Sequence, residues 1–163
     1  MKKVEICVGQ LYHDGKLGLR EVLSIDARKG TLRYRILAAK VEQEWDWQRG
    51  VAASVIGAES GCTVAAFASW AKTVHAAQAR VQLLATMAAK RLRLPQGEAT
   101  FMRSVLSEAR SAVTADTQVS YDANEQRAVN GLAKKGVLVD DDGEVTFLPL
   151  GLAWLELNLA TDK

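Results

Sequence analysis

The chain has 163 residues, of which 48% are hydrophobic and 25% are charged, and its net charge is +2. This composition is that of a folded globular protein, argues against disorder, and suits one domain or two small ones. No stretch reaches the roughly 18 uninterrupted apolar residues of a membrane span, and the start lacks the apolar run of a signal peptide, so we expect a cytoplasmic protein without membrane contact.

Charge is unevenly distributed along the chain. Residues 1–40 carry nine Lys or Arg against four acids, and residues 72–93 carry five cations and no acid. The segment 116–143 has six acids and only three cations. A polyanion should therefore be attracted more strongly to the first two-thirds of the chain than to the last third.

Residues 1–60 show the period-two alternation of half-buried strands. The runs LREVLSID and TLRYRILA are joined by the short link ARKG, which predicts a hairpin. Arg33 and Arg35 lie on the outer face of the second run and are candidate phosphate contacts. The inner faces are predicted to contain Leu19, Leu23, Ile25, Leu32, Tyr34 and Ile36.

The stretch VGQLYHDGKLGLREVLSIDARKGTLRYRILA resembles the small SH3-like or Tudor-like barrels, in which a Gly-aromatic entry strand leads into a bent hairpin. The resemblance covers about 40 residues of the chain, and it is one of pattern, without a signature motif. It implies a small β module over residues 1–60. Such barrels bind peptides, nucleic acid or nothing, so the fold alone does not decide a function.

Trp45 and Trp47 stand two residues apart and would point to the same side of a strand. Such a pair can stack a base or hold a peptide, which makes both residues candidates for partner binding. Capping of the barrel core is the simpler interpretation.

Residues 61–94 are predicted to be a connecting helical segment, because residues 63–94 lack Gly and Pro and are rich in helix-forming residues. Helix caps at Ser69 and Thr73 would break it into pieces. A three-four spacing of small and apolar residues over 73–92 indicates a seam for another helix, either within the chain or in a homodimer. The seam contains Val74, Ala77, Val81, Leu84 and Ala88, and the basic end carries the candidate phosphate contacts Lys90, Arg91 and Arg93.

Residues 95–163 predict helices and a hairpin in a fixed order. Helical spacing returns after Pro95, and a second helix should run from Asp122, with Glu125 completing a capping box, to a left-handed stop at Gly136. The runs VLV and EVTF should pair across the turn DDDG, PLG should end the second strand, and LAWLELNLA should form a last helix.

The run NEQRAVNGLAKKGVLVDDDGEVTFLPLGLAW resembles the second half of a winged-helix domain of the bacterial and phage type. That pattern is a helix ending in L-x-x-x-G-L-V, a charged turn, and L-T-x-x-G. Leu148 stands where the pattern has Thr. Only about eight residues, TADTQVSY, separate the first helix from the Asp122 helix, so the usual second helix of the family is shortened or lost. The positions that match are Leu132, Gly136, Val137, Leu138, Val139 and Gly151.

The helix after Asp122 should turn an apolar side inward and a polar stripe outward. In the winged-helix family this outward stripe enters the major groove, where Asn and Arg can contact base edges and Lys can contact phosphate. Gly131 within the stripe indicates that another surface, DNA or protein, comes close. The candidate nucleic-acid-binding residues of this helix are Asn124, Arg127, Asn130, Lys134 and Lys135.

The turn Asp140-Asp141-Asp142-Gly143 argues against a wing that grips phosphate, because three carboxylates would repel the DNA backbone. No catalytic or cofactor-binding motif is found, and His13, His75, Cys7 and Cys62 do not form a metal-binding pattern. We therefore expect a non-enzymatic DNA-binding protein without cofactors, a small transcriptional regulator of the phage or mobile-element type implied by the resemblance. The alternative is an adaptor or inhibitor that holds a protein partner with the same stripe and the two tryptophans.

Overall fold

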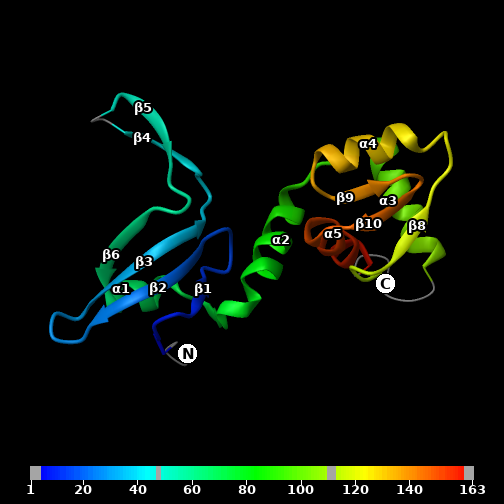
Figure 1. Ribbon diagram of the computed structural model, residues 1–163. Helices are drawn as coiled ribbons and strands as arrows, with labels where there is room; N and C mark the ends of the chain where they lie inside the picture. The colour runs from blue at the N-terminus through cyan, green and yellow to red at the C-terminus, as the bar shows by residue number, and fades with distance from the viewer. Residues whose placement is uncertain (1–4, 47–48, 110–112, 160–163) are drawn as a thin grey trace. The chain divides into compact units, whose positions relative to one another are not determined.

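The computed structural model describes residues 5–46, 49–109 and 113–159 (Figure 1). The chain belongs to the α+β class, as the sequence predicts. It divides into two compact units, Met1–Arg80 (unit 1) and Val81–Lys163 (unit 2), and a separate hydrophobic core lies in each. The boundary falls inside the segment for which the sequence predicts a connecting region.

Unit 1 contains a five-stranded antiparallel sheet with the order β6-β3-β2-β1-β7. The pairing of β2 with β3 confirms the predicted hairpin. Helix α1 (Val64–Trp70) lies between the two edge strands in the sequence. The strands are β1 (Leu11–His13), β2 (Leu19–Asp26), β3 (Thr31–Ala38), β6 (Glu59–Thr63) and β7 (Thr73–His75).

Phe67 of α1 fills the core of unit 1. Its ring centroid lies 5.4 Å from that of Tyr12, edge to face, and 5.5 Å from that of Tyr34. The register of β2 on β3 shifts just after Val22, and this β-bulge breaks the strict alternation of the strand. Val22 is therefore buried, whereas Leu23, predicted on the inner face, is only half-buried.

Strands β4 (Gln43–Asp46) and β5 (Val51–Ser54) form a separate two-stranded sheet. Figure 1 shows this ribbon extending away from the five-stranded sheet of the same unit. Trp45 lies on β4 with 53% of its surface exposed, so the prediction that it caps the barrel core is wrong. Trp47 lies outside the described residues.

The long helical segment predicted for 63–94 is interrupted. Between α1 and helix α2 (Arg80–Arg91) the chain forms β7 and a 3₁₀ turn, Ala77–Ala79. The helix predicted over 73–92 is therefore wrong in its first part, because Thr73 and Val74 are β-branched and pair with β1 instead. The predicted seam is not continuous, because Val74 lies on β7 and Ala77 in the 3₁₀ turn. Val81, Leu84 and Ala88 remain on α2, whose buried residues are Ala85, Met87 and Ala89.

Unit 2 combines α2 and three further helices with a three-stranded antiparallel sheet of order β8-β10-β9. The antiparallel pairing of β9 with β10 confirms the predicted hairpin, whereas β8 and its pairing were not predicted. The elements are α3 (Gln96–Glu108), β8 (Gln118–Ser120), α4 (Gln126–Lys134), β9 (Leu138–Asp141), β10 (Glu144–Phe147) and α5 (Pro149–Leu159). Its core contains Phe101, Met102, Val105, Val129, Leu132, Val145, Phe147 and Trp154.

Strand β10 ends at Phe147, as predicted, but helix α5 begins at Pro149, three residues before the predicted start at Leu152. Proline suits the first turn of a helix because the N–H that it lacks has no intrahelical acceptor there. The carbonyl of Val137 accepts a hydrogen bond of 3.0 Å from the N–H of Leu148. A Cβ at Gly151 would collide with that same carbonyl, so only glycine lets α5 start this close to the end of α4.

The β9–β10 turn consists of Asp142 and Gly143, which both have positive φ angles, of 54° and 100°. This is the signature of a type I′ turn, in which Asp-Gly is a preferred pair. Among the residues that the structure describes, no helix is both long and apolar enough to cross a membrane.

Candidate nucleic-acid interface

Helix α4 turns the predicted polar stripe toward solvent. Val129 and Leu132 are fully buried against the core of unit 2, as the three-four spacing predicts. All five residues that the sequence assigns to the interface on this helix and its flanks are exposed: Asn124, Arg127, Asn130, Lys134 and Lys135.

The two ends of α4 are fixed by local hydrogen bonds. The N–H of Asp122 donates to the Glu125 carboxylate at 2.9 Å, which is the reciprocal half of the predicted capping box, although the helix itself starts only at Gln126. At the other end Gly136 has a φ of +68°, and the N–H of Val137 donates to the carbonyl of Leu132 at 3.1 Å. This is a Schellman motif, so the predicted left-handed stop is confirmed.

The side chain of Glu98 on α3 is the close neighbour that Gly131 was predicted to have. A Cβ at Gly131 would collide with the Glu98 carboxylate, which is 8% exposed and accepts a hydrogen bond of 2.7 Å from Lys135. The close neighbour that the sequence attributed to DNA or a partner is thus part of the same unit. Lys135 neutralises this buried carboxylate, and its charge is not available in full to an external phosphate.

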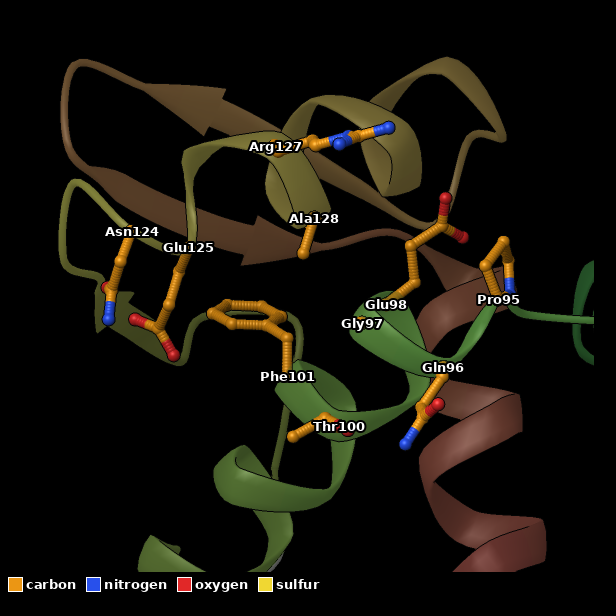
Figure 2. A pocket seen from close by; sticks show the side chains of 10 residues that line it. All are labelled: Pro95, Gln96, Gly97, Glu98, Thr100, Phe101, Asn124, Glu125, Arg127 and Ala128. Atoms are coloured by element: carbon orange, nitrogen blue, oxygen red, sulfur yellow. The ribbon is translucent and has the colours of Figure 1, made fainter.

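A groove of about 720 Å³ runs between the first turn of α3 and the start of α4. Figure 2 shows Phe101 and Ala128 pointing toward one another across it, with Asn124 and Glu125 on one side and Glu98 and Pro95 on the other. Polar side chains of the wall come from Gln96, Thr100, Asn124, Glu125 and Arg127.

The N-terminus of α3 adds a positive end to this groove. Pro95 precedes the helix and provides no side-chain cap, and the first backbone bond of the helix runs from the N–H of Ala99 to the carbonyl of Pro95. The N–H groups of Gln96 and Gly97 therefore have no intrahelical acceptor. The helix dipole and the Arg127 side chain contribute positive potential to the groove, and the carboxylates of Glu98 and Glu125, which also line it, oppose that potential.

A polar network joins α4 to the hairpin. The hydroxyl of Tyr121 donates to the Asp140 carboxylate at 2.8 Å, and the Gln126 amide donates to Asp140 at 3.2 Å and to Asn130 at 3.3 Å. Two effects raise the pKa of Tyr121 above its ordinary value: partial burial, which is the larger, and the hydrogen bond to Asp140. Asn130 is thus held by its own unit on the hairpin side of the helix, while Asn124 and Arg127 face the groove.

The hairpin is strongly acidic, as the sequence shows. Asp141, Asp142 and Glu144 are exposed around its turn. Unit 2 as a whole has nine Lys or Arg against eleven acids, while unit 1 has twelve against eight. The hairpin therefore disfavours an anionic partner on its side of α4.

The other candidate phosphate contacts lie in two places. Lys90, Arg91 and Arg93 are exposed at the end of α2 and just after it, in unit 2. Arg33 and Arg35 lie on β3 of unit 1, and each donates to the Glu59 carboxylate on β6 at 3.0 Å. Because one carboxylate pairs with both guanidinium groups, this face of the sheet is much less positive than the sequence suggests.

The sequence reasoning missed the groove and the part that α3 plays in it. Gln96, Gly97 and Thr100 lie in the first turns of α3, about 25 residues before α4, and no local pattern links the two segments. Glycine at position 131 was the one available signal, since it required a close neighbour. It did not identify Glu98 as that neighbour.

Within the described ranges, no group of three or more His, Cys, Asp or Glu side chains could hold a metal ion. Cys7 and Cys62 are both free and half-buried. Comparison with known protein families, with curated proteins and with solved structures finds no match for this chain.

Proposed function

We propose that this protein is a non-enzymatic DNA-binding regulator in which α4 of unit 2 enters the major groove. The observation that carries the proposal is the exposed stripe of Asn124, Arg127 and Lys134, whose opposite side is anchored in the core. Asn and Arg side chains can form bidentate contacts with adenine and guanine, and Lys contacts phosphate.

The order of elements in unit 2 supports a winged-helix-like module. A helix, a strand, a second helix and a hairpin follow one another as α3, β8, α4 and β9–β10, and the three strands form one sheet. A turn over Asp122–Glu125 stands where the family has its second helix. The antiparallel five-stranded sheet of unit 1 supports the resemblance to a small SH3-like barrel in the same way.

The groove gives the proposed complex a phosphate contact that does not depend on the acidic hairpin. A backbone phosphate beside the bound major groove would accept hydrogen bonds from the first N–H groups of α3 and from Arg127. Lys90, Arg91 and Arg93 supply further cations in the same unit, while Arg33 and Arg35 contribute less because Glu59 pairs with both. The proposal includes a cytoplasmic location, where the two free thiols stay reduced.

Titration of labelled random-sequence duplexes at about 50 mM salt tests this function, because phosphate contacts dominate binding at low salt. Arg127→Ala should weaken binding and lower the salt slope by about one phosphate contact. Arg103→Ala, which removes an exposed cation of α3 outside the groove, is the matched control and should change little. Absence of any duplex binding under these conditions would overturn the proposal.

A second candidate is an adaptor that binds a protein through the same groove without DNA. The excess of acids in unit 2 and the carboxylates around its hairpin favour this function. The duplex affinities of the native chain and the Arg127→Ala variant separate the two candidates. In the regulator, the native chain binds duplex DNA and the variant binds it more weakly. In the adaptor, duplex affinity is negligible for both the native chain and the variant.

A further inference from the structure

The β4–β5 ribbon of unit 1 has properties of a docking element. Within the described residues its two strands pair only with each other. An isolated two-stranded ribbon is marginally stable in water, and this one leaves large apolar side chains exposed on and beside it. They are Val41 (59% exposed), Trp45 (53%), Val51 (50%) and Ile56 (38%).

The register of the ribbon separates an aromatic face from an acidic face. Trp45 is opposite Ala52, and Glu44 is opposite Ala53. Directly opposed residues share a face, and neighbours along a strand alternate between faces. Both opposing β5 residues are alanines with short side chains, Trp45 is 53% exposed, and Glu44 is exposed as well.

We propose that the outer edge of β5 binds an extended segment of a partner protein in which apolar residues alternate with Lys or Arg. An added strand places successive side chains on opposite faces of the ribbon. A residue opposite Ala52 reaches over the methyl group to the Trp45 ring. Its neighbour, opposite Ala53, lies on the face of Glu44, where a cationic side chain is stabilised.

Charge favours such a partner over a second copy of this chain. β4 and the residue before it carry Glu42, Glu44 and Asp46, and symmetrical pairing of two β4 strands would oppose carboxylates directly. The β5 strand itself, sequence VAAS, contains no cation to meet Glu44 in a symmetrical pair, and Arg49 just before it pairs with Asp46 at 3.6 Å. A strand with apolar residues on one face and cations on the other would contact Trp45 on the first face of the ribbon and Glu44 on the second. This binding is separate from the proposed DNA binding of unit 2.

Fluorescence anisotropy of the full chain with defined ten-residue peptides tests the inference. The first peptide alternates Val and Lys, the second alternates Val and Glu, and the third alternates Gly and Lys. We expect saturable binding of the Val-Lys peptide only. Trp45→Ala should weaken it about tenfold or more, as loss of a central aromatic contact does at protein interfaces.

Charge reversal keeps the test informative even if Trp45→Ala disturbs the ribbon. Glu44→Lys should lose the Val-Lys peptide and gain the Val-Glu peptide. Glu144→Lys makes the same change of charge on an exposed strand residue of unit 2 and should do neither. Val139→Ala, an exposed apolar residue on β9, is the matched control for Trp45→Ala.

Three results would overturn the inference. The first is no saturable binding of the Val-Lys peptide, and the second is equal binding of the Gly-Lys peptide, which would show non-specific attraction. The third is a dimer in sedimentation equilibrium that Trp45→Ala dissociates, since the ribbon would then be occupied by a second copy. Duplex binding by the Trp45→Ala variant should equal that of the native chain, so failure here is distinguishable from failure of the proposed DNA function.

Discussion

Glu98 serves two structural purposes at the junction of α3 and α4. One carboxylate oxygen accepts a hydrogen bond from Lys135, and the same side chain occupies the space beside Gly131. The second oxygen is buried and has no hydrogen-bond partner within the described part of the chain. The ion pair with Lys135 is therefore the interaction that offsets the cost of burying the Glu98 charge.

Removal of the Lys135 cation should reveal the free-energy cost of burying the Glu98 carboxylate. Lys135→Met leaves the Glu98 carboxylate buried without a counter-charge, and we expect a loss of about 1–3 kcal/mol in the free energy of unfolding. Urea titration followed by circular dichroism measures it. Lys134→Met, one residue earlier and exposed, should change stability by less than about 0.5 kcal/mol. Equal effects of the two substitutions would contradict the buried pair.

Substitution of Gly131 by alanine should destabilise the protein, although the same substitution stabilises most helices. Alanine in place of glycine at an exposed helical position usually gains about 1 kcal/mol. Here the new methyl group meets the Glu98 carboxylate, so Gly131→Ala should lower the free energy of unfolding by about 1 kcal/mol instead. Gly97→Ala is the control, because nothing lies within 4 Å of a Cβ built there. Thermal denaturation of both variants distinguishes the two outcomes.

At the scale of elements, the β9–β10 hairpin is the part of unit 2 that opposes nucleic acid. Asp141→Asn with Asp142→Asn removes two exposed charges and keeps the turn, because Asn tolerates the left-handed conformation of residue 142. If duplex binding occurs as proposed, this double variant should bind several-fold more tightly at low salt, and the gain should shrink as salt is added. Anisotropy titrations at two salt concentrations measure the effect.

The matched control for the hairpin variant is Glu156→Gln, an exposed acid on α5. It changes the net charge of the unit without altering the hairpin. A comparable gain from this substitution would mean that net charge, and not the position of the hairpin beside α4, limits the affinity.

The elements that local pattern determines were predicted from the sequence. The β2–β3 and β9–β10 hairpins follow from alternation and short turns, and α4 follows from its apolar spacing and Gly136. Strands β7 and β8 were missed because they are short and gain their stability from pairing with strands distant in the sequence. The helical piece predicted to start at Thr73 fails at its beginning for the same reason.

The candidate interface was predictable only in part. The exposure of Arg127 and Lys134 follows from the helical period, which fixes which side of α4 is apolar. The groove beside Arg127 and the pairing of Lys135 with Glu98 depend on how α3 packs against α4. The pairing of Arg33 and Arg35 with Glu59 depends likewise on how β6 pairs with β3, which the sequence did not indicate.

At the scale of the whole molecule, the chain contains two hydrophobic cores that share no residue. Phe67→Ala removes the central ring of one, and Leu132→Ala removes a fully buried side chain of the other. Each should cost about 2–5 kcal/mol. We expect calorimetry of the full chain to show that each substitution lowers a different transition. A single transition that both substitutions shift alike would contradict separate units.

The division of charge between the units gives them different affinities for ions. Unit 1 has an excess of four cations and unit 2 an excess of two acids. Non-specific attraction of polyanions should therefore act on unit 1, whereas the proposed sequence recognition belongs to unit 2. In the proposed regulator, phosphate contacts of both units would contribute to the measured salt dependence, and the Arg127→Ala variant removes the share of one contact in unit 2.

The carbonyl of Val137, which accepts a hydrogen bond from the N–H of Leu148, lies three residues beyond the end of α4 and one before β9. Three elements therefore lose their contacts together if this peptide group moves. Their amide protons should exchange with solvent deuterium in one cooperative opening, and the helix that carries Arg127 cannot fray from its C-terminal end without also releasing the strand and helix behind it.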